Sequence, residues 1–200
     1  MDRIWTRHDL ERRLGARFVR YADDVVILCR RGTALPMATL RSILQRLDLT
    51  LNEHKTCVVD ATEQRFDFLG FSIGWSTSWR SGKGYAHVEP SHRAVQRLKR
   101  RVKELTSRRR TAVPMPALVG ELNRALRGWS GYFHQGNCSK VFSALRLFTG
   151  ERLRTHLRRR HKLRGRAQAY QRFPDTVLYQ HLGLFPLPTV AGWESAHASA

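Results

Sequence analysis

The stretch Arg20-Tyr21-Ala22-Asp23-Asp24-Val25-Val26-Ile27-Leu28 decides the fold of the first part of this 200-residue chain. Two adjacent carboxylates stand between short apolar runs, with Phe18-Val19 before them and β-branched residues after them. This pattern predicts a strand, a tight turn and a second strand. Asp tolerates turn geometry, so we expect the Asp pair itself at the bend. Such a hairpin would carry two negative charges at its tip.

Carboxylates as close as those of Asp23 and Asp24 repel each other unless a cation lies between them. The usual cation for a site made only of oxygen ligands is Mg²⁺. The two aspartates are therefore candidate metal ligands. An Asp-Asp pair at a hairpin turn is also common surface chemistry, and these residues alone leave that alternative open.

The charge of the chain points to a polyanionic partner. It holds 36 Lys and Arg against 16 Asp and Glu, a net charge of +20 with a pI near 11.3. Nucleic acid is the first candidate for such an excess and a membrane surface the second. No apolar run approaches the ~20 residues that cross a bilayer, so no membrane partner is expected. A hydrophobic content of 42% is enough for a packed core.

The N-terminus and the cysteines suggest the compartment. Met1 to Trp5 is polar and does not resemble a signal peptide. Cys29, Cys57 and Cys138 are scattered without a Cys-x-x-Cys spacing, which argues against a zinc site or a disulfide framework. Scattered cysteines suit a reducing compartment, so we expect a cytoplasmic protein.

Hydrophobic periodicity predicts an α+β layer up to about residue 89. An amphipathic helix is expected after Thr33, with apolar residues at helical spacing as far as Leu47. Strands are predicted at Cys57–Val59 and at Phe66–Ile73. A hairpin is predicted around the turn signal Gly82-Lys83-Gly84.

The character of the chain changes at Pro90, where a helical region is predicted to begin. Ser91 is a good N-cap. A second helix is expected from about Ala117 and a third from about Ser139, whose apolar stripe slips near Gly150 and would allow a break there. The stripe of the first helix consists of Val95, Leu98, Val102 and Leu105.

Several motifs occur in one order: Arg20-Tyr21-Ala22-Asp23-Asp24, Leu51-Asn52 with Lys55-Thr56, Phe66-Asp67-Phe68-Leu69-Gly70-Phe71, Pro90-Ser91, Leu126-Arg127-Gly128-Trp129 with Tyr132-Phe133, and Arg159-Arg160-His161-Lys162. As an ordered set they resemble the C-terminal part of a group II intron reverse transcriptase/maturase, from about Ile4 to Leu187. The resemblance implies an α+β fold: a partial palm of antiparallel strands with a packed helix, then an all-α, three-helix thumb/maturase domain. The implied domains are 1–89 (palm), 90–165 (thumb and maturase-specific region) and 166–200 (tail).

The resemblance also assigns roles in the palm. Tyr21 to Asp24 would be the metal-binding hairpin, with Asp23 the more direct ligand and Asp24 beside it. In such polymerases two metal ions about 3.5–4 Å apart stabilise the attacking and leaving oxygens. Lys55 would lie near the phosphates of the incoming nucleotide and help to neutralise or protonate the leaving pyrophosphate. An ordinary surface lysine is the alternative for Lys55.

Further roles concern nucleic acid. Phe68, Leu69, Gly70 and Phe71 match the primer grip, a hairpin that positions the 3′ end of the primer. Trp129, Tyr132 and Phe133 would either stack on bases or continue the apolar stripe into the core. The basic helices would hold template-primer and intron RNA, although a merely solvated face is the alternative. The predicted contacts are Arg97, Arg100, Arg101, Arg108, Arg109, Arg110, Arg158, Arg159, Arg160 and Lys162.

One part of the family pattern has no counterpart in this sequence. The fingers and the first palm aspartate are missing, because Asp2 and Asp9 lie in a polar stretch without an apolar strand. The family's optional C-terminal endonuclease is also missing. Asp23 and Asp24 alone are therefore expected to bind Mg²⁺ weakly, and an upstream chain would have to complete the palm.

Three hypotheses follow for the function. The chain is a fragment of an RNA-directed DNA polymerase that also binds intron RNA and assists splicing, inactive in isolation. Alternatively it is a non-catalytic RNA-binding maturase module, or a decayed remnant that folds without a selected function.

Overall fold

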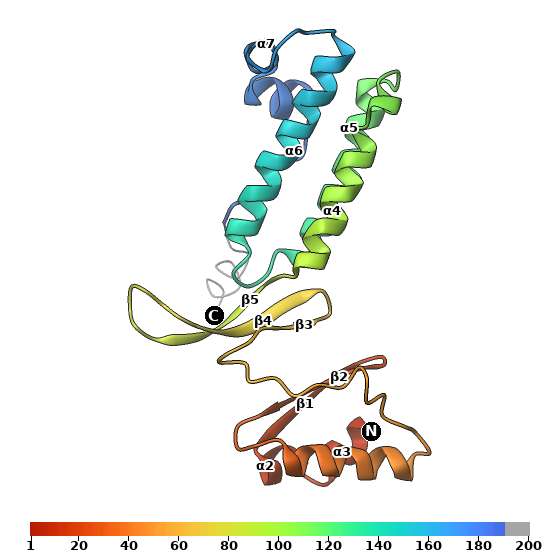
Figure 1. Cartoon of the computed structure of the whole chain (residues 1–200), viewed down its shortest axis with the longest axis vertical. Helices are drawn as coiled ribbons and strands as arrows, with labels where there is room; N and C mark the ends of the chain where they lie inside the picture. Colours follow the sequence, from red (N-terminus) through yellow and green to blue (C-terminus); the bar gives the residue numbers. More distant parts are fainter. Residues whose placement is uncertain (191–200) are drawn as a thin grey trace. The chain divides into compact units, whose positions relative to one another are not determined.

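The computed structural model describes residues 1–190. It divides into two compact units, residues 1–60 and residues from 61 onward (Figure 1). Both units contain helices and antiparallel strands, and the second continues into a helical region, so the predicted α+β class is confirmed. The last ten residues of the predicted tail, 191–200, lie outside the described residues.

The first unit is a two-stranded hairpin with helices before and after it. Tyr21 pairs with Asp24, so the turn consists of Ala22 and Asp23 alone. The prediction that both aspartates lie at the bend is therefore wrong, because Asp24 is the first residue of the second strand. The elements are α1 (Asp2–Arg7), α2 (Leu10–Leu14), β1 (Ala16–Tyr21), β2 (Asp24–Cys29) and α3 (Ala34–Arg46).

A small core covers one face of this hairpin. Trp5 is 1% exposed and stacks on Phe18 with ring centroids 4.9 Å apart. Ile43 of α3 joins the same cluster, so the predicted amphipathic helix does pack on the sheet. The opposite face of the hairpin leaves Tyr21 and Leu28 exposed.

The second unit begins with a three-stranded antiparallel sheet in the order β3 (Phe66–Phe68), β4 (Phe71–Thr77), β5 (Gly84–Pro90). The single strand predicted at Phe66–Ile73 is instead two strands, because Leu69 and Gly70 have φ angles of 50° and 81° and form a tight turn. Positive φ at both central residues is typical of a two-residue hairpin. The strand predicted at Cys57–Val59 is also wrong, since this stretch has no regular structure.

The helices begin directly after the last strand of the sheet. They are α4 (His92–Leu105), a 3-10 turn (Arg108–Arg110), α5 (Met115–Phe133), α6 (Ser139–Arg160), α7 (Arg166–Arg172) and a π-helical turn (Val177–His181). Ser91 caps α4 as predicted, since its Oγ accepts a hydrogen bond from the N–H of Ala94 (3.3 Å).

The helix α6 runs without a break through Gly150, so no kink occurs at the slip of the apolar stripe. Gly150 is buried, and a Cβ there would lie 3.7 Å from the hydroxyl of Tyr179 and 3.8 Å from Leu178. The π-helical turn thus packs on α6 beside Gly150.

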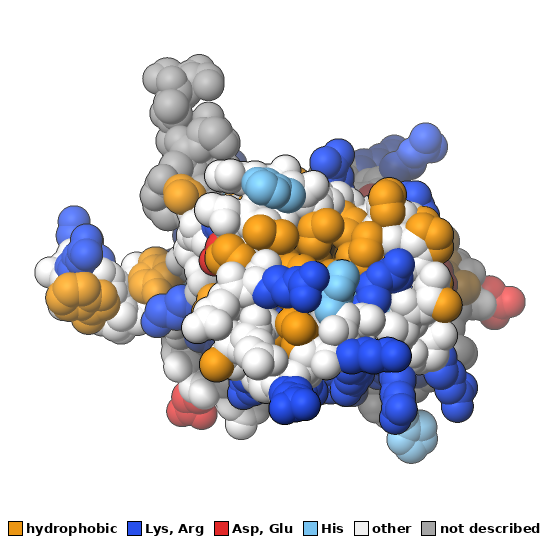
Figure 2. Space-filling model, turned by 90° about the horizontal axis from the view of Figure 1, so that it is seen from above, with side chains coloured by type: hydrophobic (Ala, Val, Ile, Leu, Met, Phe, Trp, Pro, Cys, Tyr) orange, Lys and Arg blue, Asp and Glu red, His pale blue; other side chains and the backbone are white. Residues whose placement is uncertain are grey.

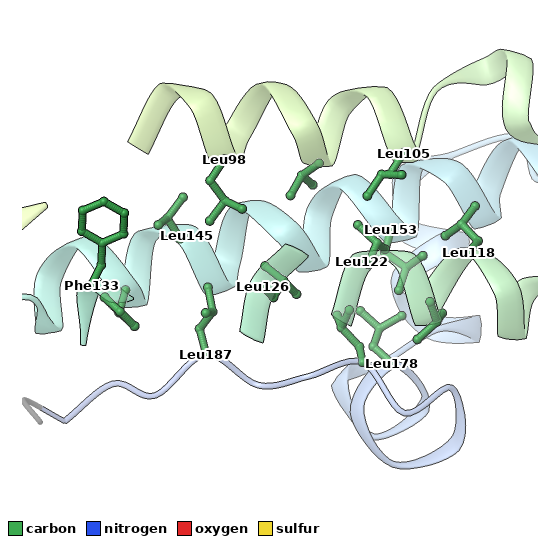
Figure 3. Close-up of a cluster of buried hydrophobic side chains, with 14 of the residues drawn as sticks. Leu98, Leu105, Leu118, Leu122, Leu126, Phe133, Leu145, Leu153, Leu178 and Leu187 are labelled. Atoms are coloured by element: carbon green, nitrogen blue, oxygen red, sulfur yellow. The ribbon is translucent and has the colours of Figure 1, made fainter. Parts of the chain in front are cut away.

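Leucine side chains from α4, α5 and α6 meet in one core (Figure 3). Leu105, Leu122 and Leu153 are fully buried, and Leu178 and Leu187 close the core from the C-terminal segment. Burying one such side chain contributes about 1.5–3 kcal/mol. Among residues 1–190, no helix combines the length and the apolarity that a membrane span requires.

Candidate nucleic-acid interface

The hairpin turn of the first unit is held by an arginine. The guanidinium of Arg20 forms an ion pair with Asp2 (2.7 Å) and donates to the carbonyl of Ala22 (3.2 Å). The hydrogen bond from Arg20 lowers the pKa of Asp2. Ala22 has a φ of 51°, which residues with a Cβ seldom adopt. Arg20 therefore steadies a strained turn and leaves Asp23 and Asp24 exposed on it.

These aspartates do not complete a metal site within residues 1–190, where no cluster of three or more His, Cys, Asp or Glu could hold a metal ion. Lys55 is exposed in a turn closed by its N–H and the carbonyl of Asn52 (3.0 Å). No hydrogen bond described in this unit joins Lys55 to either aspartate. Two exposed carboxylates without a third ligand do not form the two-metal centre of a polymerase.

The second unit contains a groove with a volume of about 480 Å³. The β3–β4 turn, the first turn of α4 and the end of α5 supply its walls. Its lining consists of Asp67, Leu69, Gly70, Ser91, Arg93, Ala94, Arg97, Trp129, Tyr132 and Phe133. Part of the predicted primer grip, Leu69 and Gly70, thus lies in the same groove as the predicted aromatic residues.

Close packing fixes the β3–β4 turn in this groove. Gly70 has a φ of 81°, which favours glycine, and a Cβ there would lie 3.2 Å from the ring of Phe133, so that ring would have to shift slightly. Phe71 packs on Phe133 with centroids 5.1 Å apart. The hydroxyl of Tyr132 donates to the carbonyl of Leu69 (2.9 Å). The turn is therefore anchored to α5 by packing and by a hydrogen bond.

The three aromatic residues of α5 have different environments. Phe133 is 9% exposed, and Trp129 packs against Phe142 and donates its indole N–H to the carbonyl of Ala94 (3.4 Å). Phe133 and Trp129 therefore belong to the core, which was one of the two alternatives predicted for them. Tyr132 is 51% exposed, although its ring also contacts Phe71 and Phe133.

The exposed face of α4 carries arginines that continue from the groove. Arg93 and Arg97 line it, and Arg100 follows one turn later on the same side. Arg101 has an ion pair with Glu104 (3.5 Å), whereas the other three form no ion pair within residues 1–190. The predicted set omits Arg93, although its i, i+4 spacing from Arg97 indicates that both share one face.

Two of the predicted contacts are engaged inside the molecule. Arg110 forms a bidentate ion pair with Glu121 (2.9 and 2.5 Å), and the hydrogen bond from Arg110 lowers the pKa of Glu121. Arg160 donates to the carbonyls of Thr111 (2.8 Å) and Val113 (2.6 Å). These arginines hold the segment between α4 and α5.

The remaining predicted cations are more open to a ligand. Figure 2 shows Lys and Arg side chains around a hydrophobic area at the end of the molecule that it views. Arg158 is half-buried. The exposed residues of the set are Arg97, Arg100, Arg101, Arg108, Arg109, Arg159 and Lys162.

The sequence alone does not predict the ion-pair network between α6 and the segment after it. Arg154 is 7% exposed, forms ion pairs with Glu151 (3.1 Å) and Asp175, and donates to the carbonyl of Phe173 (2.9 Å). Burial raises the pKa of Glu151, but hydrogen bonds from Tyr170, Arg166 and Arg154 outweigh this and lower it. The network therefore fastens α7 to α6.

A comparison with protein families finds a match in the helical region. The model of the group II intron, maturase-specific domain matches residues 95–173. Residues 95–173 are therefore similar to this domain, and they are called the maturase-specific domain below. A comparison with curated proteins finds no significant match.

The maturase-specific domain covers almost all of α4 and the whole of α5, α6 and α7. It contains more than half of the chain's 36 Lys and Arg residues, but its acidic residues are only Glu104, Glu121 and Glu151. All three carboxylates are paired with arginines of the domain. The other cations of the domain therefore have few acidic neighbours to neutralise them.

The lowered pKa of Glu151 predicts a pH-dependent contribution to the stability of the maturase-specific domain. A carboxylate with a lowered folded-state pKa stabilises the fold above its ordinary value of 4.5, and this contribution is lost as the pH falls through the folded-state value. Glu151→Gln should lower the free energy of unfolding at neutral pH, and the gap to the wild type should shrink in acid. Urea unfolding followed by the helical circular dichroism signal measures this gap.

The matched control is Glu104→Gln, because Glu104 is an exposed partner of one arginine. It should change the free energy of unfolding little at any pH. If Glu151→Gln lowers the free energy of unfolding equally at neutral and acidic pH, the lowered pKa assigned to Glu151 is wrong.

Proposed function

We propose that the maturase-specific domain binds group II intron RNA and assists its splicing, with the exposed face of α4 and the adjoining groove as the contact surface. One observation carries the proposal: Arg93, Arg97 and Arg100 lie on one exposed face of α4 without a carboxylate partner within residues 1–190. Guanidinium groups in such a row can each take a phosphate oxygen.

The energetics of this surface favour a polyanion. Like charges along one helix repel each other, and the core beneath them prevents the helix from turning the guanidinium groups inward. Phosphates of RNA would relieve the repulsion and release the counterions that both partners hold. Tyr132, at the edge of the same groove, offers an aromatic face for an unpaired base.

Removal of two of these charges should weaken RNA binding in a salt-dependent way. Each single-strand phosphate contact contributes about −0.7 to the slope of log K against log salt, so Arg97→Gln with Arg100→Gln should make that slope shallower by about 1.4. Fluorescence anisotropy of labelled group II intron RNA over a range of salt concentrations measures it. The control is Arg46→Gln, an exposed arginine of α3, which should leave the slope unchanged.

Specificity separates a maturase from a decayed remnant. Intron RNA should bind more tightly than an unrelated structured RNA of equal length in the same salt. Equal affinities for the two RNAs would favour the remnant, and affinity that is independent of salt would contradict the electrostatic account.

A second candidate function is supported by the exposed Asp23 and Asp24 on the hairpin turn. In this proposal the hairpin is part of the palm of an RNA-directed DNA polymerase, Mg²⁺ binds at these aspartates, and the groove takes template-primer. Carboxylates from outside residues 1–190 would have to join them, from an upstream chain, because the described residues contain no third ligand there.

The 200-residue chain by itself should therefore not extend a DNA primer on an RNA template in the presence of Mg²⁺. Incorporation of labelled nucleotide is the measurement. Incorporation that is abolished by Asp23→Ala and retained in Glu63→Gln, an exposed carboxylate elsewhere, would show that the chain is a complete polymerase and that this prediction is wrong.

A further inference from the structure

The hairpin of β4 and β5 extends sideways beyond the helices as a curved two-stranded arm (Figure 1). Its sequence has no acidic residue between Asp67 and Glu89, while Arg80 and Lys83 lie in the connection at its tip. The arm precedes the matched maturase-specific domain, and the proposed contact surface on α4 does not include it. Its surface chemistry is nevertheless unusual for a part of a protein exposed to water.

The tip presents a tryptophan that no other side chain buries. Trp79 is 87% exposed, and the guanidinium of Arg80 lies over its ring, 5.0 Å from the centroid. Because most of the indole is accessible, the arginine leaves a ring face open. An exposed indole lacks the burial that usually stabilises tryptophan. A role in recognition best explains its exposure.

A second tryptophan lies on the same arm. Trp75 is 52% exposed, and its indole rests against the backbone of Gly84, where an added Cβ would come within 2.5 Å of the ring. Any other residue at Gly84 would push the indole away. The glycine therefore lets Trp75 lie across the neighbouring strand with its outer face toward solvent.

Hydrogen bonds order the tip before any ligand arrives. The N–H of Ser78 donates to the carbonyl of Lys83 (2.9 Å), and the N–H of Gly82 donates to the carbonyl of Ser78 (2.8 Å). Gly82 has a φ of 64°, which the turn requires. An ordered tip loses little conformational entropy on binding.

We infer that this arm binds unpaired bases of single-stranded RNA, which stack on Trp79 and Trp75 while Arg80 and Lys83 contact the adjacent phosphates. The inference deepens the proposed function, on which it rests, by adding a second RNA site outside the maturase-specific domain. Exposed aromatic faces beside cations are the features that single strands use. No carboxylate lies between Asp67 and Glu89, which includes the whole tip of the arm, and this favours a polyanion over an apolar protein partner.

Substitutions at Trp79 test the inference with a labelled, unstructured oligoadenylate in fluorescence anisotropy. Trp79→Ala should weaken binding about tenfold, the effect of losing one stacked base. Trp79→Phe should retain most of the affinity, because it keeps an aromatic face. Trp79→Leu keeps the apolar surface without the ring and should bind as weakly as Trp79→Ala. Circular dichroism confirms that each variant is folded.

Double-stranded RNA of equal length separates this inference from the proposed function. Trp79→Ala should leave duplex affinity unchanged, whereas Arg97→Gln with Arg100→Gln should weaken binding of both RNAs. If Trp79→Ala binds the oligoadenylate as tightly as the wild type does, this inference is wrong but the proposed function is not. Wild-type affinity of Trp79→Leu also contradicts the inference, because it would indicate an apolar contact without stacking. No binding of either RNA by the wild type overturns both proposals.

Discussion

The burial of one face of α4 is the constraint on which the rest of the helical unit depends. Ala94, Leu98, Val102 and Leu105 are all buried against α5 and α6. Each contributes to a core whose larger side chains are worth about 1.5–3 kcal/mol apiece. A rotation of the helix would expose these residues and bury guanidinium groups without partners, at a cost of several kcal/mol. The core therefore dictates that the cations of α4 face outward together.

The other arginines show how the same residue type serves the fold. Arg110, Arg154 and Arg160 reach carboxylates or backbone carbonyls that would otherwise lack partners at the ends of helices. They fix the segment between α4 and α5 and the segment after α6. The close approach of Gly70 to Phe133 performs a similar task at the sheet, because it locks the β3–β4 turn against α5.

Much of this architecture could be predicted from local patterns. The 3-4-3 spacing of apolar residues and the cap at Ser91 predict α4, and the ordered motifs predict a maturase. The predictions that failed depended on contacts between residues distant in the sequence. Gly150 is helical within α6 and packs beside the π-helical turn, and Cys57–Val59 has no strand partner within the described residues. Secondary-structure propensities depend on local sequence and do not predict such distant contacts.

The same limit applies to the candidate site. A run of arginines does not reveal that Arg110 and Arg160 are occupied within the molecule whereas Arg97 is exposed, because the partners of the first two are 11 and 49 residues away. The sequence likewise does not show that Trp75 and Trp79 are exposed, because their exposure depends on how the hairpin packs. The roles of Asp23, Asp24 and Lys55 stay predictions, since no group of three or more possible metal ligands forms within residues 1–190.

The central claim is that RNA contacts the exposed face of α4 and the groove beside it. Ultraviolet cross-linking of group II intron RNA to the 200-residue chain, with mass spectrometry of the attached peptides, tests it most directly. The account predicts attachment at Tyr132 and in the peptides that contain Arg93, Arg97 and Arg100. Attachment confined to residues 1–60 would contradict it.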